Sequence, residues 1–462
     1  MTLTKPPTGA RSTEDIAAAV RRLRATYRSR RTRPIEWRLG QLEALEQLMT
    51  EREKDFVAAL ATDLGRNPVD AWLADLAPVV TESKYARKHL RSWLRPEKSK
   101  LPLVLQPGKG WVQREPLGVV GIIGPWNYPV FLLLSPLVGA IAAGNCSVIK
   151  PSEHTPTVSA LLAELLPQYL DPDTIAVVEG GAAETQDLLD QALDHVLFTG
   201  GPEIAKAILA GAAKHLTPVT LELGGKSPVI VADDASVKVA ARRVAWAKSL
   251  NSGQTCIAPD YVLVDRSVRD EFVSELEKAI TTFKSDGDLP LVHERRAGRI
   301  RELIAGANGR VVRGGGVSGK TAQLTVIVDP DPTSDLMHEE IFGPVLPIVS
   351  VDSLDEAIGR INAGDKPLAL YLFTSSRDTE RRVLDEVSNG GTVINHLIYH
   401  VLAPGLPFGG VGTSGSGAYH GRWGFETFSH RKAVLRKPAK PDPSFVYPPY
   451  NAVKERILRA LF

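Results

Sequence analysis

Apolar positions along the chain follow two different periods. Near the N-terminus they recur at helical spacing, which predicts amphipathic helices over residues 13–28, 37–63 and 73–94. A helix-start signature, Ser12-Thr13-Glu14-Asp15, opens the first of them. From Gly118 onward, short β-branched runs alternate with helical segments, a pattern typical of βαβ units on a parallel sheet.

Two such α/β series follow one another. In the first, the expected strands are 119–123, 147–150, 175–179, 195–199 and 219–221, and the expected helices are 130–143, 159–166, 183–191 and 203–215. A second series starts near Ser227, within the run Ser227-Pro228-Val229-Ile230-Val231. We therefore place a candidate domain boundary near residues 222–225.

Residues 116–149 carry no charged side chain and are long enough to suggest a membrane span. Pro125, Pro129 and Pro136, with five glycines, divide this stretch into pieces too short for one apolar helix. We expect instead a buried strand, a loop over residues 124–129, a buried helix and a second strand. The interpretation is a soluble core and no membrane span.

Composition narrows the class of protein. The 462 residues have 43% hydrophobic and 23% charged content, as in ordinary globular proteins, and suffice for two or more domains. A net charge of +2 gives no electrostatic signature of nucleic-acid binding. The chain has only two cysteines and a polar N-terminus without an apolar leader, which favours a reducing, cytoplasmic compartment.

The C-terminal region has a composition of its own. Residues 437–450 are proline-rich and expected to be extended. Val453, Ile457 and Leu461 then form one apolar stripe, which predicts a short amphipathic helix. It is too short to span a bilayer. It could dock on protein, across a dimer or over the substrate funnel, or lie on anionic lipid.

Several short motifs match part of a known signature but lack the rest of its sequence context. Residues 410–415 fit G-x-G-x-x-G, but no strand precedes them and no acidic residue follows at the required distance. Gly225-Lys226-Ser227 resembles the end of a phosphate-binding loop, yet Thr220 occupies the position of its first glycine. His338-Glu339 begins a zinc-protease motif that lacks its second histidine. The sequence predicts no metal site.

Four other side chains form a candidate catalytic constellation. Cys256 follows Gly253-Gln254-Thr255, and a thiolate there could attack a substrate once a base has taken its proton. Glu222 precedes a glycine pair and is either a buried structural acid or a base. Asn127 alone is typical of a turn, and Glu340 alone of a helix end. Their order and spacing together indicate covalent catalysis followed by hydrolysis.

With these residues in this order, the chain resembles the aldehyde dehydrogenase superfamily from Ala17 to its tail. Tyr419-His420-Gly421, Phe425-Glu426-Thr427-Phe428-Ser429-His430 and Tyr447-Pro448-Pro449-Tyr450 resemble its class 3 branch, which includes fatty-aldehyde enzymes. The resemblance implies an α/β fold: a Rossmann-like cofactor domain without the usual glycine fingerprint, an α/β catalytic domain and a small oligomerisation arm. The corresponding ranges are 1–220 with a bridging segment near 95–115, 221–400, and 401–462.

The resemblance also implies roles for particular residues. Cys256 would be the nucleophile, Glu222 would activate the hydrolytic water, and Asn127 with the Cys256 N–H would form the oxyanion hole. The reaction implied is oxidation of aldehydes to carboxylic acids through a thiohemiacetal and a thioester, with NAD, or alternatively NADP, in a homodimer. The cofactor-binding residues implied are Trp126, Lys150, Glu153, Thr199, Gly200, Gly201, Glu340 and Phe342.

Two departures from the family pattern concern the cofactor and the pocket. Residues 200–205, Gly-Gly-Pro-Glu-Ile-Ala, lack the hydroxyl and the last glycine usual after this strand. Pro202 suits a first helical turn, so we expect the helix to form, and the departure bears on the affinity and pose of the cofactor. Ser249 stands where the family usually has an aromatic or apolar residue, which predicts a small change in the pocket.

The substrate class follows from the same resemblance. Trp72 and Trp246 align with the region lining the family's substrate tunnel, and residues 394–406 contain no Lys or Arg. We expect a medium- or long-chain aliphatic aldehyde, or an aromatic one. The alternatives are a CoA-acylating enzyme, which generally lacks the hydrolytic glutamate, a semialdehyde dehydrogenase, a membrane-surface-associated fatty-aldehyde enzyme, and a non-catalytic scaffold. Glu153 beside the ribose 2′ position favours NAD over NADP.

Overall fold

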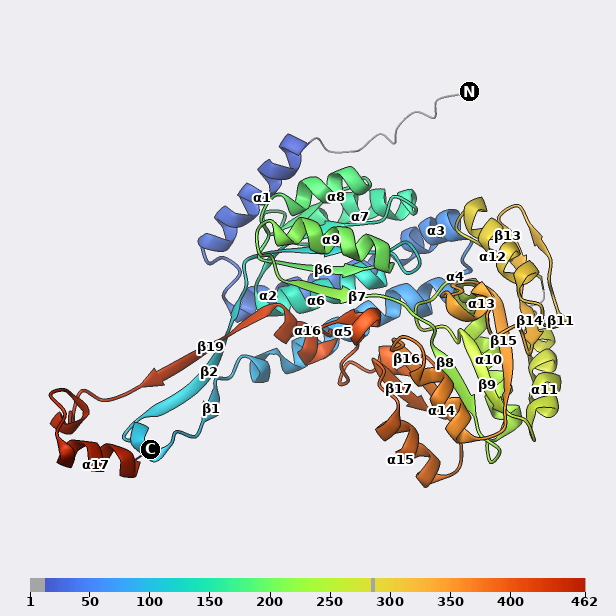
Figure 1. The fold of residues 1–462 in the computed structure, drawn as a ribbon. Coiled ribbons are helices and arrows are strands. Elements are labelled where there is room, and N and C mark those ends of the chain that lie inside the picture. The colour runs from blue at the N-terminus through green and yellow to red at the C-terminus, as the bar shows by residue number, and fades with distance from the viewer. Residues whose placement is uncertain (1–12, 284–286, 462) are drawn as a thin grey trace.

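The computed structural model describes residues 13–283 and 287–461. Two lobes, each built on a sheet, lie side by side, and an arm extends away from them (Figure 1). Ser12 and the polar N-terminal segment, on which the helix-start and leader predictions depend, lie outside the described residues. The predicted α/β fold with two sheet domains and an arm is confirmed.

The first lobe contains a six-stranded sheet that is parallel except at one edge. Its order is β18-β7-β6-β3-β4-β5. The strands are β3 (Val119–Ile123), β4 (Cys146–Lys150), β5 (Ile175–Val177), β6 (His195–Thr199), β7 (Val219–Glu222) and β18 (Gly415–Ser416). Parallel pairing places Ile123 beside Phe198, and Thr199 beside Glu222, so the carboxyl ends of these strands share one edge. In open α/β sheets this is the edge where ligands bind.

Helices cover both faces of this sheet because successive side chains of each strand point to opposite sides. On β3, Val119 and Ile123 pack in one core and Val120 and Ile122 in the other. The first core includes α1 (Thr13–Arg28), α8 (Ala182–Leu189) and α9 (Pro202–Ala213). The second includes α2 (Ile35–Glu51), α5 (Ala77–Trp93), α6 (Phe131–Ala143) and α7 (Pro156–Tyr169).

The long uncharged stretch is accounted for by β3, α6 and β4, all of which are buried. Pro136 lies inside α6, and Gly144 ends that helix in a left-handed conformation. Across the described residues, no helix has the length and apolarity needed to cross a bilayer.

The second lobe contains a seven-stranded sheet in the order β11-β14-β15-β9-β8-β16-β17. These strands are β8 (Pro228–Val231), β9 (Tyr261–Asp265), β11 (Arg310–Arg313), β14 (Thr325–Val328), β15 (Val345–Val351), β16 (Ala369–Phe373) and β17 (Gly391–Ile394). Its helices are α10 (Val237–Ser249), α11 (Arg269–Thr282), α12 (Glu294–Gly306), α13 (Asp335–His338), α14 (Leu354–Asn362) and α15 (Arg377–Glu386). A small sheet of β10 (Asp288–Pro290), β12 (Val317–Ser318) and β13 (Thr321–Gln323) lies at one side.

The prediction of a single helix over residues 37–63 is wrong. The chain forms α2 and then α3 (Glu53–Leu64), with Arg52 between them at φ −108°, ψ 20°. Apolar spacing continues across this break because both helices bury one side in the same core. Periodicity therefore detects the amphipathic face and misses the interruption.

The helix predicted over residues 73–94 is also interrupted. The short α4 (Pro68–Ala71) leads into one π-helical turn, Trp72–Leu76, before α5 begins. The π turn presents the buried Asp75, whose Oδ1 accepts the N–H groups of Val130 (3.0 Å) and Phe131 (3.0 Å). Such π turns often occur at functional sites, and this one supports the start of α6.

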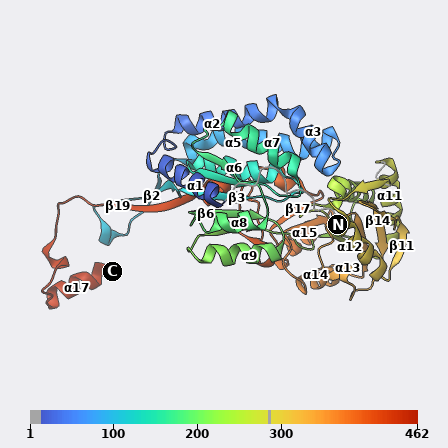
Figure 2. The ribbon, with the colours of Figure 1, turned by 90° about the horizontal axis from the view of Figure 1, so that it is seen from above.

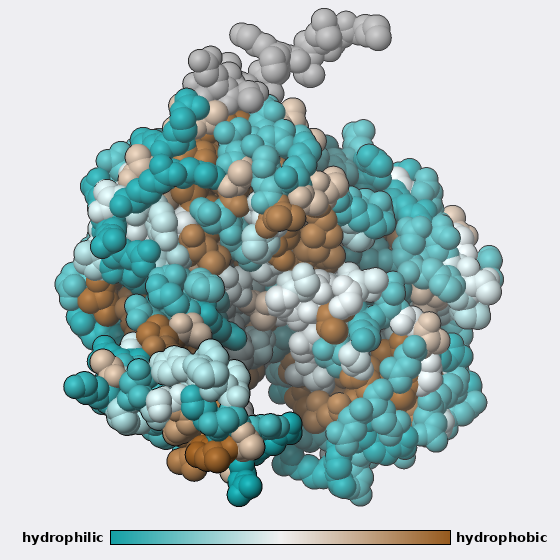
Figure 3. All heavy atoms as spheres, turned by 60° about the vertical axis from the view of Figure 1, so that its left-hand side comes forward, coloured by the Kyte–Doolittle hydropathy of each residue, from teal (hydrophilic) through white to brown (hydrophobic). Residues whose placement is uncertain are grey.

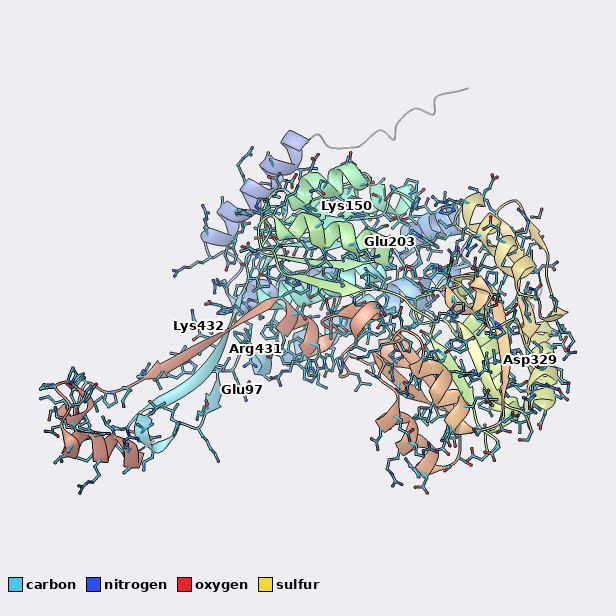
Figure 4. All side chains as sticks on the ribbon, in the orientation of Figure 1. Glu97, Lys150, Glu203, Asp329, Arg431 and Lys432 are labelled. Atoms are coloured by element: carbon cyan, nitrogen blue, oxygen red, sulfur yellow. The ribbon has the colours of Figure 1, made fainter. Side chains whose placement is uncertain are left out.

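Three antiparallel strands form the arm: β1 (Glu97–Ser99), β2 (Lys109–Pro116) and β19 (Ser429–Arg436). The pairing runs from Ser429 opposite Pro116 to Arg436 opposite Lys109. Seen from above, the arm and the C-terminal helix α17 (Ala452–Leu461) extend away from both lobes (Figure 2). Two ion pairs lie at the base of the arm. They join Lys432 to Glu115 and Arg431 to Glu426 of α16 (Gly421–Thr427); Figure 4 labels Arg431 and Lys432.

Candidate active site

The loop that carries Cys256 has a strained left-handed backbone. After α10, Asn251, Ser252 and Gly253 all have positive φ, of 48°, 58° and 70°. A β-carbon on Gly253 would lie 2.3 Å from the carbonyl oxygen of Gly343. Only glycine at position 253 therefore allows this loop to approach the backbone of Gly343 so closely. The half-buried Cys256 follows three residues later.

Hydrogen bonds hold this loop from several sides. The carbonyl of Gln254 accepts Nδ2 of Asn127 (3.1 Å) and Nδ2 of Asn251 (3.1 Å). A hydrogen bond joins Tyr128 Oη to Thr255 Oγ1 (2.7 Å), and Tyr371 Oη donates to the Ile257 carbonyl (2.6 Å). The sequence had not singled out Tyr128 or Tyr371, because their partners lie far away along the chain.

The Cys256 thiol is protonated in this environment. Burial, followed by the nearby carboxyl groups of Glu340 and Glu222, raises its pKa to about 12. A thiolate is the nucleophilic form of cysteine, so attack by Cys256 requires a neighbouring group that accepts the proton.

Glu222 is a buried carboxyl group near this thiol. It ends β7, its side chain is 2% exposed, and among the described residues neither carboxylate oxygen has a hydrogen-bond partner. Burial raises the pKa of Glu222 well above its ordinary value. A carboxylate with a raised pKa is a stronger general base than a solvated one.

Asn127 lies on the loop after β3, and hydrogen bonds to its backbone carbonyl hold it in place. Its side chain is 2% exposed, and its carbonyl accepts hydrogen bonds from Arg66 and from Nδ2 of Asn251 (3.1 Å). Arg66 also pairs with the buried Asp75 of the π turn. The interruption in the N-terminal helices thus positions the loop that carries Asn127.

A cavity of about 470 Å³ lies between the two lobes and contains most of the predicted site residues. Those lining it are Trp126, Asn127, Thr199, Gly200, Gly201, Glu222, Cys256, Glu340 and Phe342. Gly200 donates its N–H to the Glu222 carbonyl (3.0 Å), which ties the ends of β6 and β7 together. The Trp126 and Phe342 rings meet edge to face with centroids 5.5 Å apart. Residues far apart in sequence therefore meet in one chamber.

Lys150 and Glu153 do not line this cavity. Lys150, at the end of β4, donates to the carbonyls of Pro151 (2.8 Å) and Gly180 (2.6 Å) and is buried (Figure 4). The exposed Glu153 lies beside Gly181, and a β-carbon on Gly181 would be 3.7 Å from Glu153 Oε1. Both residues lie at the same sheet edge as Thr199, further along the row of strands.

Sequence reasoning missed the cationic wall of the cavity. His293, Arg295, Arg296 and Arg299, at the start of α12, line it. Arg296 donates to the carbonyl of Phe342 (3.2 Å) and stacks over the Phe342 ring at 5.4 Å. The cluster of basic residues in this segment was the available signal, but only the fold brings it opposite β6 and β7.

Other residues discussed in the sequence analysis make structural contacts outside the catalytic constellation. Lys226 pairs with Asp260 and donates to the carbonyls of Leu336 and Glu339 (both 2.9 Å), so it ties loops together. Ser249 donates to the carbonyl of Ala245 within α10 (2.7 Å). Trp246 meets His396 and Tyr399 edge to face, while Trp72 is 44% exposed on the π turn. Within residues 13–283 and 287–461, no three His, Cys, Asp or Glu side chains gather as a metal site.

Comparison with known proteins agrees with this geometry. The model of the aldehyde dehydrogenase family matches residues 7–434. The chain belongs to the aldehyde dehydrogenase family. It is 46% identical over 445 residues to aldehyde dehydrogenase family 3 member A2 of Rattus norvegicus, covering 94% of this chain and 92% of that protein. It is 45% identical over 451 residues to the dimeric, NADP-preferring aldehyde dehydrogenase of Canis lupus familiaris, with 96% and 99% covered.

Solved structures show the same fold. The structure of the substrate-bound state of AldH from Staphylococcus aureus superposes with a TM-score of 0.92 at 39% identity, covering 97% of this chain and 99% of that one. The predicted family and activity are confirmed: the dehydrogenase oxidises aldehydes to carboxylic acids with NAD or NADP as cofactor.

Proposed function

We propose that Cys256 carries out this oxidation covalently, with Glu222 as base and Asn127 as oxyanion donor. The observation that carries the proposal is the meeting of all three in one cavity between the sheets. Glu222 takes the thiol proton, and Sγ of Cys256 bonds to the aldehyde carbon. The oxygen that becomes negative accepts hydrogen bonds from Asn127 Nδ2 and the Cys256 N–H.

The second half of the reaction releases the acid. NAD(P) supplies the hydride acceptor when bound, and loss of hydride leaves a thioester on Cys256. Glu222 passes the thiol proton to solvent and then takes a proton from water, whose oxygen bonds to the acyl carbon. The C–S bond breaks, and the carboxylic acid leaves. Retention of Glu222 argues against a CoA-acylating enzyme.

The residues around the cavity fit a dinucleotide. The N-terminus of α9 begins directly after Gly200 and Gly201, and a helix N-terminus favours phosphate groups. We propose that Glu340 holds the nicotinamide ribose with Phe342 and Trp126 packed beside it, and that Lys150 and Glu153 hold the adenosine ribose. Arg295 would add positive charge opposite α9, where the chain lacks the usual hydroxyl.

We propose a preference for NAD over NADP. The carboxylate of Glu153 would accept hydrogen bonds from a ribose 2′-hydroxyl and repel a 2′-phosphate. A relative with 45% identity carries the name NADP-preferring, so the two cofactors must be compared directly.

We propose a medium- or long-chain aliphatic aldehyde, or an aromatic one, as substrate. Trp246, His396 and Tyr399 form an aromatic cluster, with the His396 and Tyr399 rings stacked at 3.8 Å. Tyr399, Leu402 and Leu406 expose about half of their surface on the same segment, which has no Lys or Arg. These features suit an apolar substrate better than a carboxylated semialdehyde.

We also propose a cytoplasmic homodimer assembled through the arm. Residues 431–461 carry eight Lys or Arg against two acids, Asp442 and Glu455. Tyr450 and Val453 of this region are mostly exposed, as is Leu103 between β1 and β2. The surface in Figure 3 shows hydrophobic patches separated by hydrophilic residues. A second copy would cover such an arm. Two free cysteines favour a reducing compartment.

One panel tests activity, cofactor and substrate together. Octanal, benzaldehyde and succinic semialdehyde are offered with NAD and with NADP, each with and without CoA, while NAD(P)H absorbance and the product are followed. The expected result is carboxylic acid without CoA, a higher kcat/KM for NAD, and better turnover of octanal or benzaldehyde. Thioester release to CoA, NADP preference or preference for the semialdehyde would contradict the respective part of the proposal.

A further inference from the structure

The short strand β18 brings a class 3 motif against the proposed base. Gly415 of β18 lies opposite Glu222 of β7 in an antiparallel pair. A few residues later, Tyr419 is fixed by two backbone hydrogen bonds to Phe408, of 2.8 and 3.0 Å. A β-carbon on Gly417 would lie 2.9 Å from Thr220, so this return segment packs directly on β7. The backbone that carries Tyr419 is therefore fixed against the strand that ends at Glu222.

The hydroxyl of Tyr419 is buried without a partner. Its side chain is completely inaccessible, and in the described part of the chain Oη has no hydrogen bond. The carboxylate oxygens of Glu222 share this condition. Buried polar groups almost always have a partner, because leaving one unsatisfied forfeits its hydrogen bonds to water. Two such groups on neighbouring segments point to a shared polar ligand.

The electrostatic environment of the Tyr419 hydroxyl also involves Glu222. The pKa of the Tyr419 hydroxyl is raised far above its usual value by burial, and next by the nearby carboxylate of Glu222. The phenol is therefore neutral throughout the working pH range and acts only as a hydrogen-bonding group.

Two other tyrosines flank the nucleophile and serve a different purpose. Tyr128 bonds Thr255, and Tyr371 bonds the carbonyl of Ile257, so both hydroxyls support the loop itself. Tyr419 has no such protein partner among the described residues. Its hydroxyl is free to bind a small polar species between itself and Glu222.

We propose that Tyr419 Oη and the Glu222 carboxylate together hold the water that hydrolyses the thioester. This inference rests on the proposed function. The water donates one hydrogen to Glu222 and the other to Tyr419 Oη, which leaves a lone pair facing the acyl carbon on Cys256. Glu222 takes the first proton as the water oxygen bonds to carbon and the C–S bond breaks. Tyr419 keeps its own proton and is a positioning residue.

The test measures the acyl group on Cys256 directly. Wild type, Tyr419→Phe and Glu222→Gln react with octanal and NAD, are quenched at steady state, and are weighed intact by mass spectrometry. The decay of the adduct is followed after substrate is removed. Tyr419→Phe keeps the ring and removes only the hydroxyl. It should accumulate adduct and slow its decay about tenfold, as the loss of one hydrogen bond worth about 1.4 kcal/mol predicts.

Added hydroxylamine separates positioning from folding. It attacks thioesters without help from a positioned water, so it should clear the Tyr419→Phe adduct as fast as the wild-type adduct. Tyr27→Phe is the matched control, since it deletes a hydroxyl that bonds the Pro116 carbonyl (3.0 Å) outside the cavity. Its adduct should decay at the wild-type rate.

Each other outcome decides against one proposal. Adduct in Glu222→Gln with unchanged decay in Tyr419→Phe would overturn the role of Tyr419 alone. Slower formation of the adduct in Tyr419→Phe with unchanged decay would assign Tyr419 to the nucleophile loop and likewise overturn it. Hydride transfer in Glu222→Gln, seen as a burst of NADH, with no adduct on Cys256 would refute the covalent mechanism itself.

Discussion

The carboxylate of Glu340 lies directly against the backbone of Gly224. A β-carbon on Gly224 would be 2.3 Å from Oε2 and 2.4 Å from Oε1 of Glu340, distances that no side chain tolerates. Burial, followed by the neighbouring Asp260, raises the pKa of Glu340 to about 8. The segment between the two sheets thus determines where this carboxylate can lie.

Gly224→Ala should therefore displace Glu340 and weaken cofactor binding. We expect the Kd for NAD, measured by calorimetry, to rise about tenfold, as the loss of one good hydrogen bond predicts. Gly298→Ala is the matched control, because Gly298 lies in α12 with nothing within 4 Å of the added carbon. Equal Kd values in both variants would remove Glu340 from the cofactor site.

Cys256→Ser should abolish aldehyde oxidation, because a hydroxyl is a far poorer nucleophile than a thiolate. Its Kd for NAD should stay within about twofold of wild type, since the side chains differ by one atom. Cys146→Ser, at the buried second cysteine, separates loss of nucleophile from loss of a thiol in general. Oxidation by Cys256→Ser within tenfold of wild type would exclude covalent catalysis at this residue.

Glu222→Gln should slow turnover more than hydride release. Hydride leaves before water attacks, so the pre-steady-state burst of NADH should persist while the steady-state rate falls by roughly 10²–10⁴, the usual contribution of a general base. Stopped-flow absorbance separates the two phases. If both fall equally, Glu222 acts mainly on the Cys256 thiol.

The same substitution should change stability in a pH-dependent way. Below about pH 4.5, Glu222 is protonated in folded and unfolded chains alike, and its titration contributes nothing. As the pH rises, the unfolded chain releases the proton first, because burial raises the folded pKa, so Glu222 progressively favours unfolding.

Glu222→Gln cannot titrate, so it should be more stable than wild type at pH 8 relative to pH 4. Each unit of raised pKa corresponds to about 1.4 kcal/mol in this difference. Urea unfolding at both pH values measures it, and the comparison cancels the groups that titrate in both proteins. A difference that is constant with pH would mean that Glu222 is not held in a desolvating environment.

Deleting residues 451–462 should weaken the proposed dimer or alter the kinetics of long-chain aldehydes. Burying the larger apolar side chains of the α17 stripe could contribute roughly 1.5–3 kcal/mol each. Sedimentation equilibrium measures the first effect, and octanal and longer aldehydes test the second. Glu455→Ala leaves the stripe intact and removes only the ion pair to Arg459 (2.9 Å), so it should behave like wild type.

A different outcome would favour the membrane-surface alternative. If the full chain sediments with vesicles containing anionic lipid and the truncated chain does not, while both remain equally dimeric and active, then α17 binds lipid. Vesicles of neutral lipid provide the comparison, since the positive charge of α17 would not attract them.

Much of the fold follows from local pattern. Alternation of β-branched runs and helices marks β3, α6, β4 and the elements after them, because buried parallel strands and their covering helices have distinct periods. The break at Arg52 and the π turn at Trp72–Leu76 were missed, since amphipathic spacing continues through both. Asp75 explains the π turn only once its partners on α6 are known.

The sequence by itself determined the family, the aldehyde-oxidising chemistry and the order of Asn127, Glu222, Cys256 and Glu340. The tertiary structure alone decided that they share a cavity with the Arg296 wall, that Glu340 rests on Gly224, and that the segment leading to Tyr419 pairs with Glu222. The physical reason is that residue type and spacing record local backbone preference, whereas these contacts join separate strands and two different sheets. Burial, pKa and hydrogen-bond satisfaction arise only when those segments pack together.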